Sequence, residues 1–269
     1  NLVNGKCSDY KDENIQIRNI LIKDIELFKS NNQKNTNDIV ADLNLIFLNS
    51  GIFIDVNERS KIKICLNYKA EKDYTIFQHN FFNFLKNSEV IIEENFYLTE
   101  NTINNIYNNI NIEENSKIKH DIFQDFVSSN KLLLTSNTSI AKKSSYSQSS
   151  YNFSKGFVRN FHSAKLNGEF SKASLKGCFF LKNDNVCSNK TYITHNAENC
   201  ESDQTYKGIL NNSSKANYYS NTFVSKNAQK TEGYQLSKGI LLSENCTFFS
   251  KPELRIFADD VKCSHGSTI

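Results

Sequence analysis

The chain has 269 residues, 23% of which are charged, and its formal net charge at pH 7 is +3. A chain of this length can bury a core of its own. Its charge is too balanced to indicate binding to nucleic acid or to a membrane surface, and no apolar run approaches the length of a membrane span.

Seven cysteines are spread along the chain without a CxxC pair or a zinc-finger spacing. Their odd number argues against a complete disulfide framework and favours free thiols in a reducing compartment. The sequence contains no methionine, so we expect the chain to begin internally and to be a fragment. It has no GxxxxGK[ST] phosphate-binding loop, so we do not expect it to hydrolyse ATP itself.

Residues 1–51 are predicted to form an N-terminal segment with one clear element, a helix at about 38–50. Asp38 can cap the start of this helix, and Gly51 is well placed to end it. Apolar residues recur at four-residue spacing, as on one face of a helix: Ile39, Leu43 and Phe47.

From Ile52 onward the pattern changes to short strands, and residues 52–269 are predicted to form the body of the fold. Two stretches lack a clear strand pattern. One is rich in Asn and Ile near 93–120, and the other is rich in Ser near 135–152. Both are predicted to be loop insertions.

A Lys-Gly pair followed by apolar residues recurs at two equal intervals of 31 residues, beginning at Lys176, Lys207 and Lys238. Short strands at a fixed period, with no helical pattern between them, are typical of a β-solenoid whose turns share one apolar column. The candidates for this column stand two residues after each glycine: Phe179, Leu210 and Leu241. Because the chain has one proline and nine glycines, Asn and Asp are expected to form most turns.

The densest group of reactive side chains lies near the C-terminal end. Apolar residues alternate with other side chains after Pro252, which predicts a strand with one buried face: Leu254, Ile256 and Ala258. Cys263 and His265 follow at a spacing that places both on one side of an extended strand. A thiolate and an imidazole suit a soft or borderline metal, although a pair is only half a site.

Other interpretations of these residues stay open. Asp259 and Asp260 are adjacent, so on a strand they would point to opposite faces, which disfavours the acid pair of a retaining glycosidase. Carboxylates that hold turns or contact a partner chain fit better. Cys263 and His265 could be a nucleophile and its base, but no orienting residue or oxyanion loop is identifiable. His265 could also be a hydrogen-bonding turn residue before Gly266.

Residues 251–268 read Lys-Pro-Glu-Leu-Arg-Ile-Phe-Ala-Asp-Asp-Val-Lys-Cys-Ser-His-Gly-Ser-Thr. This run closely resembles the signature of SufD-type chains in the SufB/SufD family, which are scaffolds of the SUF iron–sulfur cluster assembly system. Four earlier blocks resemble the same family in the same order: 195–197, 204–208, 228–235 and 241–245. Arg255, where the family often has an acidic residue, and Cys246, which has no clear counterpart, depart from the family pattern.

The resemblance implies a mainly β fold, a right-handed parallel β-helix, and a non-catalytic scaffold. Its expected partners are SufB, bound through the β-helix, and the ATPase SufC, bound through a C-terminal segment that we expect to be missing here. ATP would then act only through SufC. We expect bacterial cytoplasm as the location, or a plastid or apicoplast, because the Asn, Lys and Ile bias suits an AT-rich protist.

The resemblance also implies site residues. His265 would be an iron ligand at the SufB interface, with Cys263 as a supporting thiol, for a transient iron–sulfur cluster shared with SufB. The remaining motif residues are expected at the partner interface: Asp259, Asp260, Lys262, Ser264 and Gly266. Two other classes compete with this interpretation. One is a carbohydrate-active β-helix enzyme similar to pectate lyase, and the other is a β-solenoid that serves only in binding.

Overall fold

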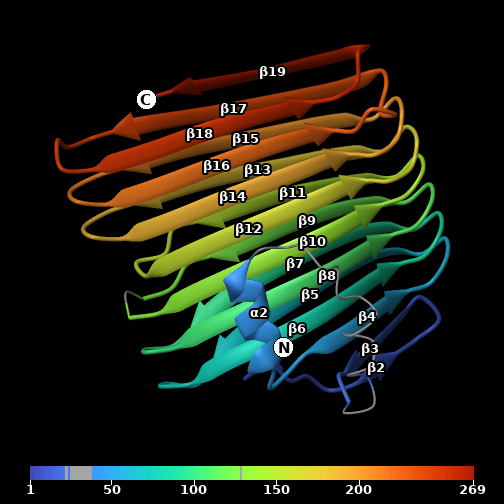
Figure 1. The fold of residues 1–269 in the computed structure, drawn as a ribbon. Helices are drawn as coiled ribbons and strands as arrows, with labels where there is room; N and C mark the ends of the chain where they lie inside the picture. The colour runs from blue at the N-terminus through green and yellow to red at the C-terminus, as the bar shows by residue number, and fades with distance from the viewer. Residues whose placement is uncertain (22–23, 25–37, 128) are drawn as a thin grey trace.

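The computed structural model describes residues 1–21, 24, 38–127 and 129–269. Over these residues the chain is a parallel β-solenoid of about 8 turns with one short helix, as Figure 1 shows. The predicted parallel β-helix is therefore confirmed. None of the helical structure in the described ranges is long and apolar enough to cross a membrane.

Each complete turn contributes one strand to each of two long sheets, and strands one turn apart pair in parallel. The pairs of β2 with β3 and of β3 with β4 are antiparallel. Sheet A contains β1 (Leu2–Val3), β5 (Lys61–Ala70), β7 (Glu89–Leu98), β9 (Lys117–Gln124), β11 (Ser145–Asn152), β13 (Lys172–Leu181), β15 (Glu201–Leu210), β17 (Thr231–Leu241) and β19 (Val261–Thr268). Sheet B contains β2 (Tyr10–Lys11), β3 (Ile15–Asn19), β4 (Ile52–Val56), β6 (Thr75–Phe84), β8 (Ile103–Ile112), β10 (Lys131–Ile140), β12 (Phe157–Leu166), β14 (Val186–His195), β16 (Lys215–Val224) and β18 (Thr247–Ile256).

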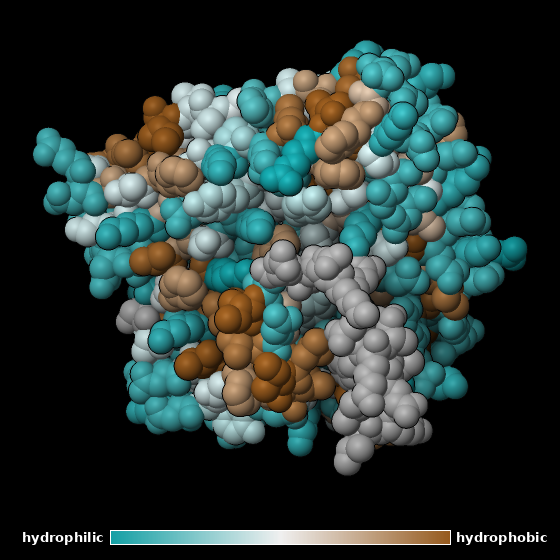
Figure 2. All heavy atoms as spheres, in the orientation of Figure 1, coloured by the Kyte–Doolittle hydropathy of each residue, from teal (hydrophilic) through white to brown (hydrophobic). Residues whose placement is uncertain are grey.

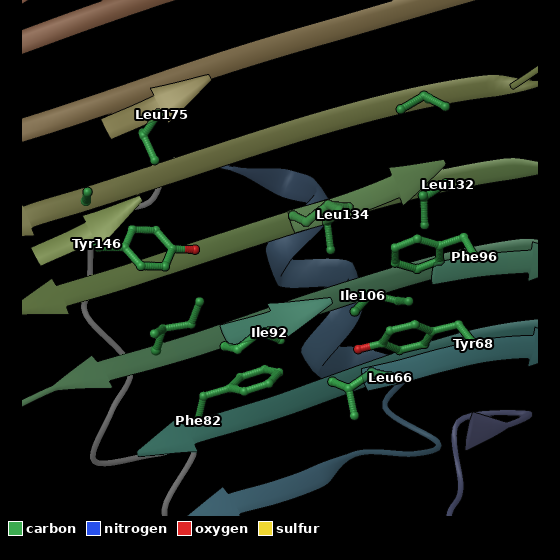
Figure 3. Packing of buried hydrophobic residues seen from close by; sticks show 14 of the residues in the cluster. Leu66, Tyr68, Phe82, Ile92, Phe96, Ile106, Leu132, Leu134, Tyr146 and Leu175 are labelled. Atoms are coloured by element: carbon green, nitrogen blue, oxygen red, sulfur yellow. The ribbon is translucent and has the colours of Figure 1, made fainter. Parts of the chain in front are cut away.

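The core lies between the two sheets, where alternate residues of every strand point inward. Stacked turns bring inward side chains from successive turns into contact, as Figure 3 shows for a row that includes Tyr68 and Phe96. These two rings stack with their centroids 4.6 Å apart. Tyr206 and Tyr218, from opposite sheets, stack at 4.2 Å. Aromatic contacts of this kind stabilise the packing of neighbouring turns beyond the area that they bury.

The expected apolar column was only partly right. Leu210 is in register with Leu181 and Leu241, not with Phe179, which lies opposite Gly208. The reason is that β13 and β15 are 29 residues apart in register, from Lys172 to Glu201, whereas β15 and β17 are 31 apart, from Glu201 to Glu232. Phe179 fills the space that a side chain at position 208 would need. The sequence repeat therefore marks the strands but not their register.

Asparagine and aspartate hold most of the positive-φ positions among the described residues, as the low glycine content predicted. Positive φ values occur at Asn87, Asn101, Asn115, Asn183, Asn199 and Asn212, all between strands. Asparagine tolerates this left-handed conformation better than most residues with a side chain.

The two predicted loop insertions are wrong. Residues 93–120 lie in β7, β8 and β9 with their short turns, and residues 135–152 lie in β10 and β11. Both stretches resemble loops because polar residues occupy inward positions, and in the first stretch several of these side chains bond to the neighbouring turn. Asn80 Nδ2, for example, donates to Asn108 Oδ1 at 2.9 Å. In-register stacking thus satisfies amide groups that usually indicate a loop.

The predicted helix is present but shorter. α2 spans Ile39–Ile46, and the Asp38 side chain caps it by accepting a hydrogen bond from Val40 N at 3.2 Å. The helix ends at Phe47, so Gly51 does not terminate it. Gly51 is needed for another reason, because a Cβ there would overlap the backbone carbonyl of His79.

α2 lies against sheet B with Ala41 and Asn44 buried and Leu45 packed against Phe53 and Phe81. Buried Asn44 donates to the backbone oxygens of Gln78, at 3.0 Å, and Asn105, at 2.8 Å. The periodic residues of the sequence pattern are exposed instead: Ile39, Leu43 and Phe47. Strands that precede Ile52 also join both sheets, since β1 pairs with β5 and β3 pairs with β4.

Candidate functional site

Among the described residues, the last strand of each sheet has one edge without a strand partner. β18 pairs with β16 and β19 pairs with β17, and neither has a second strand partner within the described ranges. The predicted strand after Pro252 is the second half of β18, and proline is tolerated on such an edge. Its inward side is only partly buried, with Ile256 39% exposed, because no described turn covers it.

Cys263 and His265 lie on β19, opposite Gly233 and Gln235 of β17. Gly233 and Gln235 are buried on the inner side of β17. Because residues in register on neighbouring strands point to the same side of a sheet, Cys263 and His265 also lie on the inner side. The two side chains therefore share one side at the open end of the solenoid, as their spacing predicted. They are the motif residues best placed to meet a group that approaches this end.

The environments of these two residues differ. Cys263 is half-buried beside an apolar cluster that includes Val224 and Ala258, and this burial raises the pKa of its thiol. A metal ligand must be the thiolate, so burial opposes metal binding by Cys263. His265 is exposed and forms no hydrogen bond or ion pair with the described residues. Its imidazole is the more available ligand.

The chain does not assemble a complete metal site by itself. Among the described residues, no group of three or more His, Cys, Asp or Glu side chains is arranged to hold a metal ion. Cys263 and His265 can supply at most two ligands, and an iron site needs more. Any further ligands would have to come from a partner or from the bound group.

The other motif residues surround this pair. Asp259 and Asp260 form the exposed bend between β18 and β19, and the bend is held by backbone contacts. Lys230 N donates to Asp260 O at 2.6 Å, and Asp260 N donates to Gln229 Oε1 at 2.9 Å. The two carboxylates are therefore free of the turn-holding role that the sequence suggested.

The outer side of β19 carries the remaining three motif residues. Lys262 forms an exposed ion pair with Glu232 at 3.1 Å, and Ser264 is exposed without a hydrogen bond to the described residues. Gly266 has an ordinary extended backbone, and a Cβ there would meet only Leu236 at 3.6 Å. Its place in the motif does not depend on a positive φ.

His195, Cys187 and Cys200 have structural roles. His195 is fully buried, with Nε2 2.9 Å from Ser202 Oγ. Cys187 accepts hydrogen bonds from two amides in the core, and burial raises the pKa of its thiol to about 12. Cys200 lies 3.3 Å from Ser171 Oγ, and both thiols are free. These residues are too enclosed to act on a substrate.

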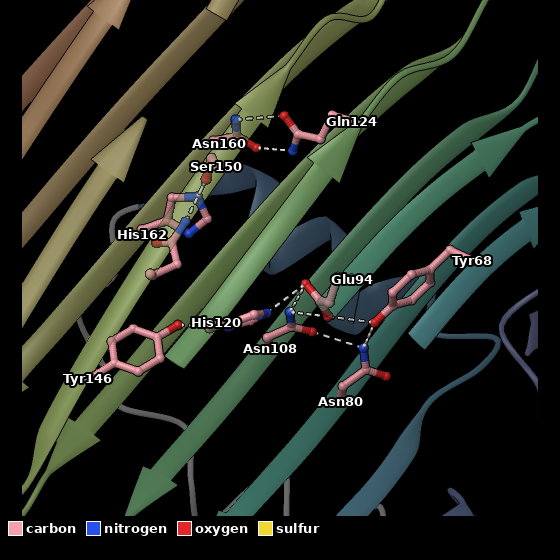
Figure 4. Close-up of polar contacts among 11 residues, drawn as sticks. Tyr68, Asn80, Glu94, Asn108, His120, Gln124, Tyr146, Ser150, Asn160 and His162 are labelled. Atoms are coloured by element: carbon pink, nitrogen blue, oxygen red, sulfur yellow. Dashed lines mark hydrogen bonds and ion pairs between the residues drawn. The ribbon is translucent and has the colours of Figure 1, made fainter. Parts of the chain in front are cut away.

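The sequence interpretation missed a buried polar network inside the solenoid, shown in Figure 4. Glu94 is fully buried and accepts hydrogen bonds from Tyr68 Oη at 2.8 Å and from Asn108 Nδ2 at 3.2 Å. His120 Nε2 lies 3.2 Å from Glu94 Oε2 without hydrogen-bond alignment, so this contact is electrostatic. His120 Nδ1 lies 2.9 Å from Tyr146 Oη.

The alternation of β7 could have revealed this network. Val90 and Ile92 point inward, so the same period places Glu94 inward and Glu93 outward. Glu94 and His120 are both fully buried, which keeps any substrate away from them. The network therefore supports the fold and is not a second reactive site.

Comparison with known proteins connects this geometry to a family. Residues 49–269 match the family described as "SUF system FeS cluster assembly, SufBD core domain". Over 112 residues, the chain is 30% identical to the iron–sulfur cluster assembly protein SufD of Escherichia coli (strain K12). This stretch covers 42% of the chain and 26% of the relative, so it spans about a quarter of that protein. Because the family match covers residues 49–269, which form most of the solenoid, the chain belongs to the SufB/SufD family of the SUF iron–sulfur cluster assembly system.

Proposed function

We propose that the chain is a SufD-type scaffold that pairs with SufB through the free edges of β18 and β19. Each edge offers unpaired backbone donors and acceptors, which favour the addition of a strand from another chain. Asp259, Asp260, Lys262, Ser264 and Gly266 would then lie in or beside the interface. In this proposal the chain is not an enzyme, and ATP acts through SufC.

The observation that best supports this proposal is the placement of His265 and Cys263 on the inner side of the last strand. There, His265 would ligate iron of a transient cluster, and Cys263 would support it. Since this chain offers two ligands at most, a cluster would form when SufB supplies the others. Separation of the two chains would then release the cluster.

The test is His265→Ala in the full-length protein, in its complex with SufB and SufC. Loss of a ligand is expected to lower cluster yield by about tenfold or more, measured as iron and sulfide content and visible absorption after anaerobic reconstitution. Complex formation, measured by size-exclusion chromatography, should be unchanged because the backbone edge remains. Ser267→Ala, at the next inward position of the same strand, is the matched control. Wild-type cluster yield from His265→Ala would show that His265 is not a ligand.

A further inference from the structure

The outer face of sheet B carries cations without acidic partners near the C-terminal end. On sheet A, outward lysines of neighbouring turns pair with carboxylates: Lys172 with Glu201, Lys176 with Asp203, and Lys262 with Glu232. On sheet B, Lys190 and Lys251 form no ion pair with any described residue. Lys190 instead lies over the ring of Phe161, 4.9 Å from its centroid. Lys207 and Lys238 on sheet A also form no ion pair with any described residue, so the lack of an acidic partner does not by itself distinguish Lys190 and Lys251.

These lysines border a hollow of about 250 Å³, here called the basic groove. Its side chains come from β14, β16 and β18: Lys190, Tyr192, Tyr219, Asn221, Lys251 and Glu253. Lys190, Tyr219 and Lys251 are in register on the three strands. Because adjacent strands are about 4.8 Å apart, the Cα atoms of the two lysines are separated by about 9.6 Å. Figure 2 looks onto this face, where teal side chains lie among paler and brown ones above the brown patch over α2.

The one carboxylate of the groove is already neutralised. Glu253 Oε1 accepts a hydrogen bond from Arg255 Nε at 2.7 Å and forms an ion pair with Arg255 Nη2 at 2.7 Å, and Oε2 accepts from Asn221 Nδ2 at 3.0 Å. The hydrogen bond from Arg255 also holds the pKa of Glu253 below its usual value. Glu253 therefore does not cancel the charge of Lys190 and Lys251.

We propose that the basic groove binds an extended acidic segment of a partner protein that also carries aromatic side chains. In an extended chain, carboxylates two residues apart lie on one side about 7 Å apart, and flexible lysine side chains whose Cα atoms are about 9.6 Å apart can reach both. The rings of Tyr192 and Tyr219 can pack against aromatic side chains that follow those carboxylates on the same side of the segment. A nucleic acid fits less well, because the groove offers only two unpaired cations and places Glu253 beside them. The proposal does not depend on the role of His265.

The test measures binding of a fluorescein-labelled peptide that repeats Glu-Ser-Glu-Ser-Phe-Ser, which presents glutamate and phenylalanine on one side of an extended chain, by fluorescence anisotropy. The double variant Lys190→Glu/Lys251→Glu is expected to bind at least about tenfold more weakly than the wild type. The matched control is Lys207→Glu/Lys238→Glu, which makes the same charge change on exposed, in-register lysines of sheet A. It should change the affinity by less than about twofold. Circular dichroism would verify that both variants are folded.

Three results would overturn the proposal. The first is no binding of the peptide to the wild type at low ionic strength. The second is equal loss of affinity in the two double variants, which would show that the effect comes from the net charge of the chain and not from the groove. The third is a single-stranded oligonucleotide that binds more tightly than the peptide and depends on Lys190 and Lys251, since this would reassign the groove to nucleic acid.

Discussion

Acidification from about pH 7 to about pH 5 is expected to remove most of the free energy of unfolding. Three buried histidines carry this effect. Desolvation lowers the pKa to about 3 for His79 and His162, and to about 4 for His195. In the unfolded chain, each imidazole returns to a pKa near 6.5. Protons therefore bind to the unfolded chain first, so the stability is complete above about pH 6.5 and falls as the pH drops toward the folded pKa values.

At pH 5, each of these histidines lowers the free energy of unfolding by about 2 kcal/mol, and the three together lower it by about 6 kcal/mol. This sum is comparable to the whole stability of many proteins, which is about 5–15 kcal/mol. Urea unfolding followed by circular dichroism between pH 7.5 and pH 5 would measure the loss. Below about pH 6, the slope of the free energy of unfolding against pH is expected to approach about 4 kcal/mol per pH unit, the value for three protons.

Two variants separate the buried histidines from other causes of acid unfolding. His162→Gln removes one of the three protons, so the slope should fall by about one third. His265→Gln changes an exposed imidazole on β19 and should leave the slope at the wild-type value. Equal slopes in wild type and His162→Gln would contradict this account and would assign the acid sensitivity to carboxylates.

The sequence predicted the architecture better than it predicted the register. The Lys-Gly repeats correctly indicated stacked strands, because each turn must place apolar residues at equivalent inward positions. They could not give the 29-residue interval between β13 and β15, because Phe179 and Gly208 fit together only across neighbouring strands. Complementary packing of this kind involves residues far apart in sequence and leaves no local pattern.

The polar strands could not be predicted for a related reason. Asn80 and Asn108 are inward residues whose amides bond to each other from neighbouring turns. Considered alone, each segment resembles a loop, because the hydrogen-bond partner is a full turn away in sequence. The surroundings of the candidate site also depend on residues that are distant in sequence. The spacing of Cys263 and His265 predicted that they share a side, but the free edge next to them appears only when the strands are stacked.

The second large effect is expected from Glu94→Ala, which should lower the free energy of unfolding by about 3–5 kcal/mol. The change removes the acceptor for Tyr68 Oη and Asn108 Nδ2 and the charge beside His120, in a region that water does not reach. Tyr68 would then be a fully buried hydroxyl that retains one contact, to Asn80 Nδ2 at 3.3 Å. Global urea unfolding near pH 7.5 is the measurement.

Glu93→Ala is the matched control, since it removes the neighbouring carboxylate on the outer side of the same strand. Glu93 pairs with Lys63 at 2.7 Å, and the Lys63 side chain is 57% exposed, so this loss should cost less than about 1 kcal/mol. Glu94→Gln should fall between the two, because an amide keeps the volume and one acceptor but not the charge. Equal costs for Glu93→Ala and Glu94→Ala would contradict the buried network as a source of stability. A large difference would show that the interior of the solenoid depends on its polar contacts as well as on its apolar column.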